Sequence, residues 1–253
     1  MILVLAGTTE GREILLEIKA RGWPYIASLY SDYGAKILSE VHEDRLINGP
    51  LGKKGLSELV IEKQIKVIVD TTHPFATEIS QNAINTAKQL KLPYIRLERK
   101  QFDIKESSLV KKIHSLEEIK PYLLNELTVF STLGSNSLPA LIPIIKSKNA
   151  KLFIRVIPNS QILKQCEKLG LNKNQIIAKQ GPFSIEDNMK MFKHVNANLI
   201  LSKESGVEGG LDTKIAAAKA LKTPHLILAR PNINYPIAYN SYEDVIKYLS
   251  NIY

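Results

Sequence analysis

The segment VIVDTTHPFATEIS, residues 67–80, joins a buried strand pattern to side chains that can do chemistry. Its apolar run ends at Asp70, and Thr72 and His73 follow almost at once. Pro74 suits the first turn of a helix, where its missing N–H is harmless, and it favours extended backbone just before it. The pattern predicts that His73 lies at the end of a strand, displayed toward a ligand. The alternative is a histidine that only finishes a helix end.

A second cluster follows the first apolar run, in the motif LAGTTEGRE. A turn between a strand and a helix can hold a phosphate with backbone N–H groups at the positive end of the helix. Glycines permit a tight turn and close packing, and threonines add hydroxyl groups. The candidate phosphate-binding residues are Gly7, Thr8, Thr9, Glu10, Gly11 and Arg12. The motif is not GxGxxG, and a capped helix after a strand is the alternative explanation.

Polar turns also end the second and third predicted strands. Ser31 and Asp32 follow the second strand, where dinucleotide-binding folds bind the adenosine ribose. An acid-containing turn is the simpler explanation of this pair. Residues 48–52 form a glycine-rich loop after the third strand. Together with the loop at His73, these turns give one sheet edge four polar or glycine-rich loops. That convergence favours a nucleotide site.

The second half of the chain has its own candidate site in SKESGVEGGLDTKIAAAK, residues 202–219. Glycine pairs and Ser205 precede an alanine-rich helix, with Lys203 and Lys214 on either side. Backbone N–H groups at a helix start, combined with lysines, are well suited to anions. A flexible lid and a plain long turn are the alternatives.

Several other kinds of site and location are disfavoured. The helix after His73 carries no partner ligand at helical spacing, so no protein-bound metal is expected. The single Cys166 cannot form an internal disulfide. No stretch approaches the roughly 20 apolar residues of a membrane span. The sequence therefore predicts a cytoplasmic protein without a membrane partner.

The formal net charge of +9 favours polyanionic partners. Nucleic acid is disfavoured because the lysines are scattered, and no basic stripe with interleaved aromatic residues is present. A substrate with several carboxylates or phosphates remains, and so does a lysine-rich surface with no partner.

Apolar runs alternate with helical patterns along the chain, which predicts parallel sheets with helices on both faces. Two α/β units fit this alternation better than one very large sheet. The predicted domains are residues 1–108 and 109–253, with the boundary between about 98 and 128. The predicted strands are 2–5, 25–30, 45–47, 66–70, 94–97, 110–114, 128–132, 152–157, 176–178, 199–202 and 225–229. The predicted helices are 10–20, 56–64, 77–90, 116–124, 138–147, 160–169, 185–194, 213–221 and 242–252.

These motifs together resemble the precorrin-6A reductase family of corrin-ring biosynthesis, including its cobalt-precorrin-6A form. The matching segments, in family order, are LAGTTEGR, DTTHPFA, RLER, RVIP, GPF, SKESGVEGG and ARP. DTTHPFA and ESGVEGG are the distinctive ones. The resemblance implies two Rossmann-like parallel-sheet domains with a cleft between them. It also implies hydride transfer from a nicotinamide nucleotide to a tetrapyrrole edged with acetate and propionate groups, in cobalamin biosynthesis.

The resemblance further implies roles for individual residues. Residues 7–12 would hold the pyrophosphate, Ser31 and Asp32 the adenosine ribose, and Thr72 would lie near the nicotinamide. The residues that would face the tetrapyrrole are Arg155, Lys203, Ser205, Gly206 and Arg230. His73 is the candidate catalytic residue, and positioning is favoured over a role as proton donor.

The cofactor is expected to be NADH in preference to NADPH. A carboxylate at Asp32 accepts ribose hydroxyls and repels a 2′-phosphate, and no arginine follows within a few residues. Lys36 is close enough in sequence to weaken this argument. Some members of the family carry a basic or neutral segment at this point.

Two other functions stay open at this stage. One is a non-enzymatic nucleotide- or nucleic-acid-binding protein that uses the same loops and charge. The other is a different NAD(P)-dependent reductase or epimerase, which would usually show a Tyr-x-x-x-Lys pair on a helix, and none is present near the predicted nicotinamide edge. The sequence leaves open whether the ring already carries cobalt, and also the oligomeric state.

Overall fold

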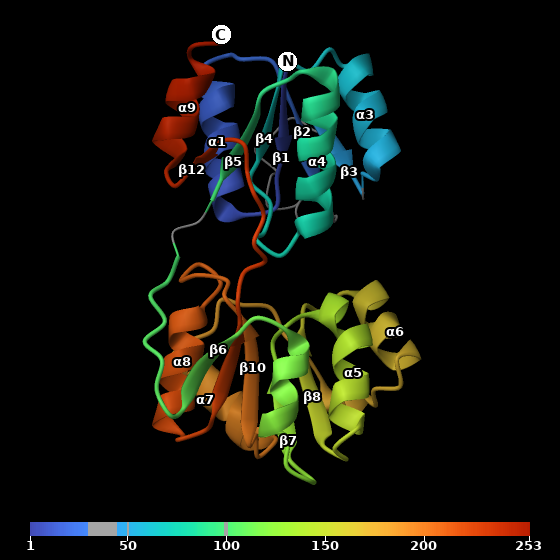
Figure 1. The fold of residues 1–253 in the computed structure, drawn as a ribbon, viewed down its shortest axis with the longest axis vertical. Coiled ribbons are helices and arrows are strands. Elements are labelled where there is room, and N and C mark those ends of the chain that lie inside the picture. The colour runs from blue at the N-terminus through green and yellow to red at the C-terminus, as the bar shows by residue number, and fades with distance from the viewer. Residues whose placement is uncertain (30–44, 50, 99–100) are drawn as a thin grey trace. The chain divides into compact units, whose positions relative to one another are not determined.

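The computed structural model describes residues 1–29, 45–49, 51–98 and 101–253. The chain forms two compact units, drawn in Figure 1. Unit 1 contains Met1–Lys100 and Pro231–Tyr253, and unit 2 contains Gln101–Arg230. This division differs from the predicted second domain, residues 109–253, at its C-terminal end. The last segment returns to unit 1 because its short strand pairs with the first sheet and its helix packs there.

The sheet of unit 1 has six parallel strands in the order β12-β5-β4-β1-β2-β3. Its strands are β1 (Ile2–Leu5), β2 (Tyr25–Leu29), β3 (Leu46–Asn48), β4 (Val67–Asp70), β5 (Tyr94–Leu97) and β12 (Ala238–Tyr239). Its helices are α1 (Thr9–Ala20), α3 (Lys53–Glu62), α4 (Thr77–Leu90) and α9 (Tyr242–Leu249).

Both faces of this sheet are covered, as a parallel sheet requires. On one face, Ile2 and Val4 pack with Ile14 of α1 and Val245 of α9. On the other face, side chains of α3 and α4 cover the alternate positions of the same strands. The two helix pairs lie on opposite sides of the sheet in Figure 1. The central strands therefore read as continuous apolar runs, and polar residues are left for the strand ends.

The sheet of unit 2 also has six parallel strands, in the order β6-β11-β10-β7-β8-β9. Its strands are β6 (Val110–Ile113), β7 (Thr128–Ser131), β8 (Lys151–Val156), β9 (Ile176–Ala178), β10 (Leu199–Lys203) and β11 (His225–Leu228). Its α-helices are α5 (Leu138–Lys146), α6 (Ser160–Lys168), α7 (Ile185–His194) and α8 (Leu211–Ala220). Short 3-10 helices are η2 (Leu116–Tyr122), η3 (Ser135–Ser137) and η4 (Lys173–Gln175).

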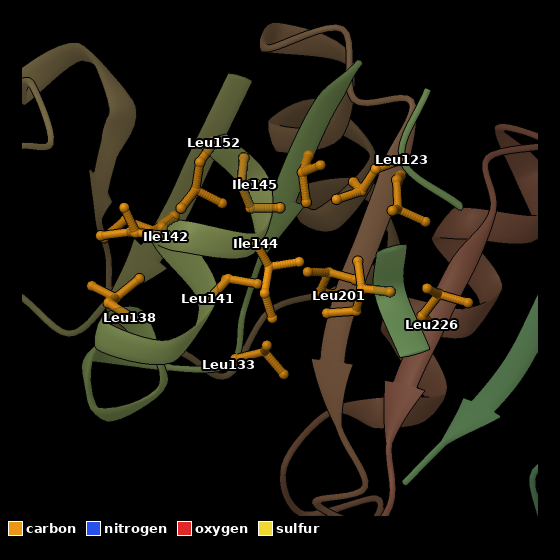
Figure 2. Close-up of a cluster of buried hydrophobic side chains, with 14 of the residues drawn as sticks. Leu123, Leu133, Leu138, Leu141, Ile142, Ile144, Ile145, Leu152, Leu201 and Leu226 are labelled. Atoms are coloured by element: carbon orange, nitrogen blue, oxygen red, sulfur yellow. The ribbon is translucent and has the colours of Figure 1, made fainter. Parts of the chain in front are cut away.

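One face of the second sheet is packed by leucine and isoleucine side chains from α5 and its neighbours, shown in Figure 2. Leu141 and Ile145 of α5 point toward Leu201 and Leu152 of the strands. The other face is covered by α7 and α8, where Phe130 and Phe192 meet edge to face. Arg155 of β8, one residue of the second candidate site, contacts α7 on this face.

Most predicted elements are confirmed within one to three residues, and the exceptions have physical reasons. Residues 116–124 form the 3-10 helix η2, which carries Pro121 inside it, because proline breaks the α-helical hydrogen-bond pattern. β12 has only two residues, too few for an alternating pattern to be recognised. Across the described residues, every helix is too short or too polar to cross a bilayer.

Candidate functional site

The loop between β1 and α1 is tied to the loop after β4. Thr8 caps α1, since its Oγ1 accepts a hydrogen bond from the Gly11 N–H at 3.2 Å. The same hydroxyl donates to the carbonyl of Thr71 at 2.8 Å. This cap holds the N-terminus of a 12-residue helix at the carboxyl edge of the sheet, where it can favour an anion.

The two glycines of this loop have different surroundings. A Cβ built on Gly11 would lie 2.3 Å from Oγ1 of Thr71, which itself donates to the Leu5 carbonyl at 2.9 Å. Gly11 is therefore required for the close approach of the helix and the loop. Gly7 is exposed, and no atom lies within 4 Å of a Cβ built there. The loop is therefore closely packed at Gly11 and open to solvent at Gly7.

The other predicted nucleotide-binding residues are placed only in part. Thr9 is exposed at the first position of α1, and Arg12 is half-buried on the same first turn. Ser31 and Asp32 lie outside the described residues. The described part of the edge offers the turn and helix start expected for a pyrophosphate.

Below the His73 loop, a buried carboxylate receives five hydrogen bonds. Asp70 at the end of β4 is 0% exposed. Its Oδ1 accepts from the backbone N–H and the hydroxyl of Thr72 at 2.9 and 2.7 Å, and from Nη1 of Arg96 at 2.8 Å. Its Oδ2 accepts from Ser80 and from the phenol of Tyr94, each at 2.6 Å. Every lone-pair direction of the carboxylate is used, so Asp70 fixes Thr72.

Arg96 completes this network from the neighbouring strand β5. It is 1% exposed, and its Nε donates to Glu98 at 2.9 Å. Burial alone would lower the pKa of Arg96, but the charges of Asp70 and Glu98 outweigh burial and raise it. Burial, then the charge of Asp70, raises the pKa of Tyr94, so this phenol stays protonated and donates. Tyr235 stacks on Tyr94 and lies against the Arg96 guanidinium.

His73, the residue after Thr72, closes a turn at this end of β4. Its Nδ1 accepts a hydrogen bond from the Phe75 N–H at 3.2 Å, and its carbonyl accepts from the Ala76 N–H at 2.8 Å. Pro74 and Phe75 form this turn, and α4 begins after it at Thr77, as predicted. With Nδ1 as an acceptor, the other ring nitrogen carries the proton and is the donor of the imidazole.

The second edge is built around a buried arginine on β8. Arg155 donates from Nη1 to Oδ1 of Asn188 at 2.8 Å, and its guanidinium lies 4.0 Å from the ring centre of Phe183. Burial lowers the pKa of Arg155 to about 10. Asn188 is fully buried on α7 and also donates to the hydroxyl of Thr213 at 3.3 Å. The guanidinium is thus held by neutral groups.

The predicted anion loop forms the start of α8. Lys214 is buried in the first turn of that helix, and its Nζ donates to the Gly209 carbonyl at 2.7 Å. Burial, followed by the charge of Arg155, lowers the pKa of Lys214 to about 7. Lys203, the last residue of β10, is half-buried, and burial lowers its pKa as well. Three cations therefore lie at or below the surface of this edge.

Glu204 anchors the same loop. Its carboxylate accepts from Lys112 at 2.9 Å and from the Arg230 backbone N–H at 3.0 Å, while Nε of Arg230 donates to its carbonyl at 3.0 Å. Ser205 is buried next to it, and Gly206 has a φ of +80°, a conformation that favours glycine. The structure brings the predicted residues Lys203, Ser205, Gly206 and Arg230 together on one loop and its neighbour.

The sequence reasoning missed the residues that support these two edges, namely Asp70, Ser80, Tyr94, Arg96, Asn188 and Glu204. The sequence contained a signal for the support in unit 1, because Asp70 and Arg96 are charged residues in two apolar strands. These two residues are partners in the register of β4 and β5. Within the described residues, no group of three or more histidine, cysteine or acidic side chains is arranged to hold a metal ion.

Comparison with known proteins gives a match over almost the whole chain. A family model described as "Precorrin-6x reductase CbiJ/CobK" matches residues 1–250. The cobalt-precorrin-6A reductase of Priestia megaterium is 32% identical over 254 residues, which cover 99% of this chain and 98% of the relative. The cobalt-precorrin-6A reductase of Methanocaldococcus jannaschii has the same identity and coverage.

A solved structure shares the fold. The structure titled "CobK precorrin-6A reductase" superposes with a TM-score of 0.77 over 99% of this chain and 96% of that chain. The sequence identity is 20%, so this likeness concerns the fold. Two six-stranded parallel sheets with flanking helices are therefore an established arrangement, and the predicted Rossmann-like α/β class is confirmed.

Proposed function

The chain belongs to the precorrin-6x reductase family, a family of oxidoreductases in cobalamin biosynthesis, and from this membership we propose that its substrate is cobalt-precorrin-6A. The observation that carries the proposal is the end-to-end match to two relatives that bear this name. The product is the corresponding 6B form. A nicotinamide nucleotide supplies the hydride in this reaction.

The nucleotide pyrophosphate is proposed to bind at residues 7–12. The capped start of α1 supports this assignment, because its first backbone N–H groups and its dipole favour a phosphate. The open space at Gly7 also supports the pyrophosphate assignment, because a backbone without a side chain can approach a ligand closely. Thr9, Glu10 and Arg12 on the first turn would provide polar contacts.

NADH is proposed in preference to NADPH. The support comes from the sequence alone, since Ser31 and Asp32 lie outside the described residues. Asp32 would accept the ribose hydroxyls and repel a 2′-phosphate. Steady-state kinetics with both nucleotides tests this preference. An equal or higher kcat/KM with NADPH would contradict it.

Thr72 and His73 are proposed to hold the reacting end of the nucleotide and the substrate in position. The buried network around Asp70 supports this role because it fixes Thr72 from below. His73 accepts the Phe75 N–H at Nδ1, a contact that fixes the orientation of its ring. Positioning of this kind contributes to rate by orientation.

The tetrapyrrole is proposed to bind along Arg155, Lys203, Ser205, Gly206 and Arg230. The cationic character of this edge supports the assignment, because the substrate carries several carboxylates. The net charge of +9 would also speed the approach of such an anion.

Anaerobic incubation of the protein with NADH and either cobalt-precorrin-6A or its metal-free form tests the proposed function. We expect nicotinamide oxidation at the rate at which the macrocycle spectrum changes, with the cobalt form as the better substrate. No oxidation with either form would refute the proposed function. Faster turnover of the metal-free form would refute only the assignment of cobalt.

A further inference from the structure

Tyr235, in the last segment of the chain, packs against the buried Asp70 network. Its ring stacks on that of Tyr94, with 6.4 Å between ring centres and 6° between the planes. The guanidinium of Arg96 lies 5.2 Å from the centre of the same ring. Burial raises the pKa of the Tyr235 phenol, and a hydrogen bond with Ser80 acts in the opposite direction. Tyr235 therefore lies against the three side chains, on α4 and β5, that donate to Asp70.

Backbone hydrogen bonds fix the segment that carries Tyr235. The Arg96 N–H donates to the carbonyl of Ile237, and the Glu98 N–H donates to that of Tyr239, each at 2.8 Å. These bonds accompany the pairing of β12 with β5. They hold the backbone just after Tyr235 along the strand that carries Arg96. The position of the Tyr235 ring is therefore set by the sheet as well as by the network that the ring contacts.

The orientation of Arg96 decides how Thr72 is held. Nη1 of Arg96 donates to Oδ1 of Asp70 at 2.8 Å and to Oγ1 of Thr72 at 3.2 Å. The Thr72 hydroxyl in turn donates to Asp70 at 2.7 Å. An aromatic ring against the planar face of a guanidinium restricts the rotation of that group. Without the ring, the Glu98 carboxylate, which already accepts from Nε of Arg96 at 2.9 Å, would compete for the same guanidinium.

We propose that Tyr235 is a positioning residue for the reaction, because it holds Arg96 in the orientation that fixes Thr72 and, through Thr72, the turn at His73. This inference rests on the proposed function, in which Thr72 and His73 position the reacting groups. The turn at His73 is connected to β4 through Thr72, so a change in the orientation of Thr72 displaces the turn. Small displacements of this kind lower the rate steeply, because catalysis depends on the alignment of the reacting atoms.

The substitution Tyr235→Met (Y235M) tests the inference in the full-length protein. It removes the ring and leaves a flexible side chain that fills the space. Tyr239→Met (Y239M) is the matched control, since Tyr239 is a half-buried tyrosine of the same segment whose ring lies against Tyr248 in the other core.

The kinetic constants with cobalt-precorrin-6A and the nucleotide separate positioning from packing. We expect Y235M to lower kcat about 10-fold and to leave both KM values within about twofold of the wild type, because the contact acts on the transition state. Y239M should keep the wild-type kcat, whether or not it loses stability. A wild-type kcat in folded Y235M would overturn the inference, and so would an equal loss of kcat in Y239M.

Two further variants examine the ring and its partner. Tyr235→Phe keeps the ring beside Arg96, so its kcat should stay within about threefold of the wild type. A loss as large as that of Y235M would assign the effect to the hydroxyl and overturn the inference. If Y235M does not fold, Arg96→Lys (R96K) replaces it, because lysine keeps the charge beside Asp70 but loses the planar group that reaches Thr72. A wild-type kcat in R96K would overturn the inference.

The His73 ring gives a second readout that needs no substrate. Its proton–carbon NMR resonance is assigned by its absence from the spectrum of His73→Ala. The resonance should shift in Y235M and keep its wild-type position in Y239M, and an unmoved resonance in Y235M would overturn the inference. Absence of turnover in the wild-type protein would instead refute the proposed function, so the two failures are distinct.

Discussion

Replacement of Lys214 by methionine should stabilise the protein, and by more at pH 7 than at pH 9. A lysine that loses its hydration without gaining a carboxylate destabilises the folded state. Methionine fills a similar volume without a charge, so the variant avoids that penalty. A site built for an external anion should carry this cost in the absence of the ligand.

The size of the effect follows from the pKa of Lys214. Burial, with Arg155 as the second cause, lowers it from 10.5 to about 7. Since a tenfold change in proton affinity is about 1.4 kcal/mol, the difference is worth about 5 kcal/mol at most. The folded pKa is the lower one, so the unfolded chain binds more protons between these values and stability rises with pH. The destabilisation caused by burying the charged Lys214 is therefore nearly complete at pH 7 and about 2 kcal/mol smaller at pH 9.

Urea unfolding at the two pH values measures this difference. Far-UV circular dichroism follows both units, and the fluorescence of Trp23, the single tryptophan, follows unit 1. K214M also removes the hydrogen bond to the Gly209 carbonyl, a loss of about 1 kcal/mol. That loss is the same at both pH values. Any change between pH 7 and pH 9 in the stability difference between K214M and the wild type therefore comes from the charge of Lys214. Lys219→Met (K219M), at an exposed position of the same helix, is the matched control and should show no such change.

Two results would refute the reasoning. If the stability difference between K214M and the wild type changed by less than about 0.5 kcal/mol from pH 7 to pH 9, Lys214 would not be desolvated as the structure indicates. If the K219M control gave the same pH dependence as K214M, the effect would come from net charge alone.

Three further predictions concern unit 1. Gly11→Ala should destabilise this unit by about 1–3 kcal/mol in urea unfolding followed by Trp23 fluorescence, because its methyl group would overlap the loop after β4. Gly7→Ala should keep the stability and raise the nucleotide KM about tenfold; equal effects of the two substitutions on stability would contradict this. Tyr94→Phe should lower the free energy of unfolding by about 1–3 kcal/mol, because the buried Asp70 carboxylate loses one hydrogen-bond donor. Arg96→Met should lower the free energy of unfolding more, by about 3–5 kcal/mol, because it removes the cation paired with Asp70. A larger loss in Tyr94→Phe than in Arg96→Met would contradict this account of the Asp70 network. His73→Ala should lower kcat/KM about 10- to 100-fold without removing a limb of the pH profile, whereas a fall near 10⁴-fold with loss of a limb would make His73 the proton donor.

The order of the elements could be predicted from the sequence because the local signals are strong. The stripe of apolar residues in α4 and the continuous apolar runs of β1 and β4 each define one element. The return of residues 231–253 to unit 1 could not be predicted. It depends on a two-residue strand and on packing between α9 and α1, which are far apart in the chain.

The loops and flanking cations of the candidate site could be predicted from the sequence, but the burial and pairing of the charges could not. The position of Thr8 and Gly11 after a strand already indicates a capped helix start. By contrast, the motif marks Lys214 as a cation beside the loop, but its burial depends on tertiary packing. Asp70 and Arg96 are both visible in the sequence, but their pairing depends on the register of two strands.

Buried charges are compensated differently at Asp70 in unit 1 and at Lys214 in unit 2. In unit 1, Asp70 has its partners within the protein, including Arg96, so that its role is to hold the loop above it. In unit 2, Glu204 neutralises Lys112 at 2.9 Å, which shows that the same loop can supply an acid to a lysine. Ten residues later the chain gives Lys214 a carbonyl instead. The chain thus compensates Lys112 with a carboxylate and Lys214 only with a neutral group, which agrees with the proposal that unit 2 binds an anionic substrate.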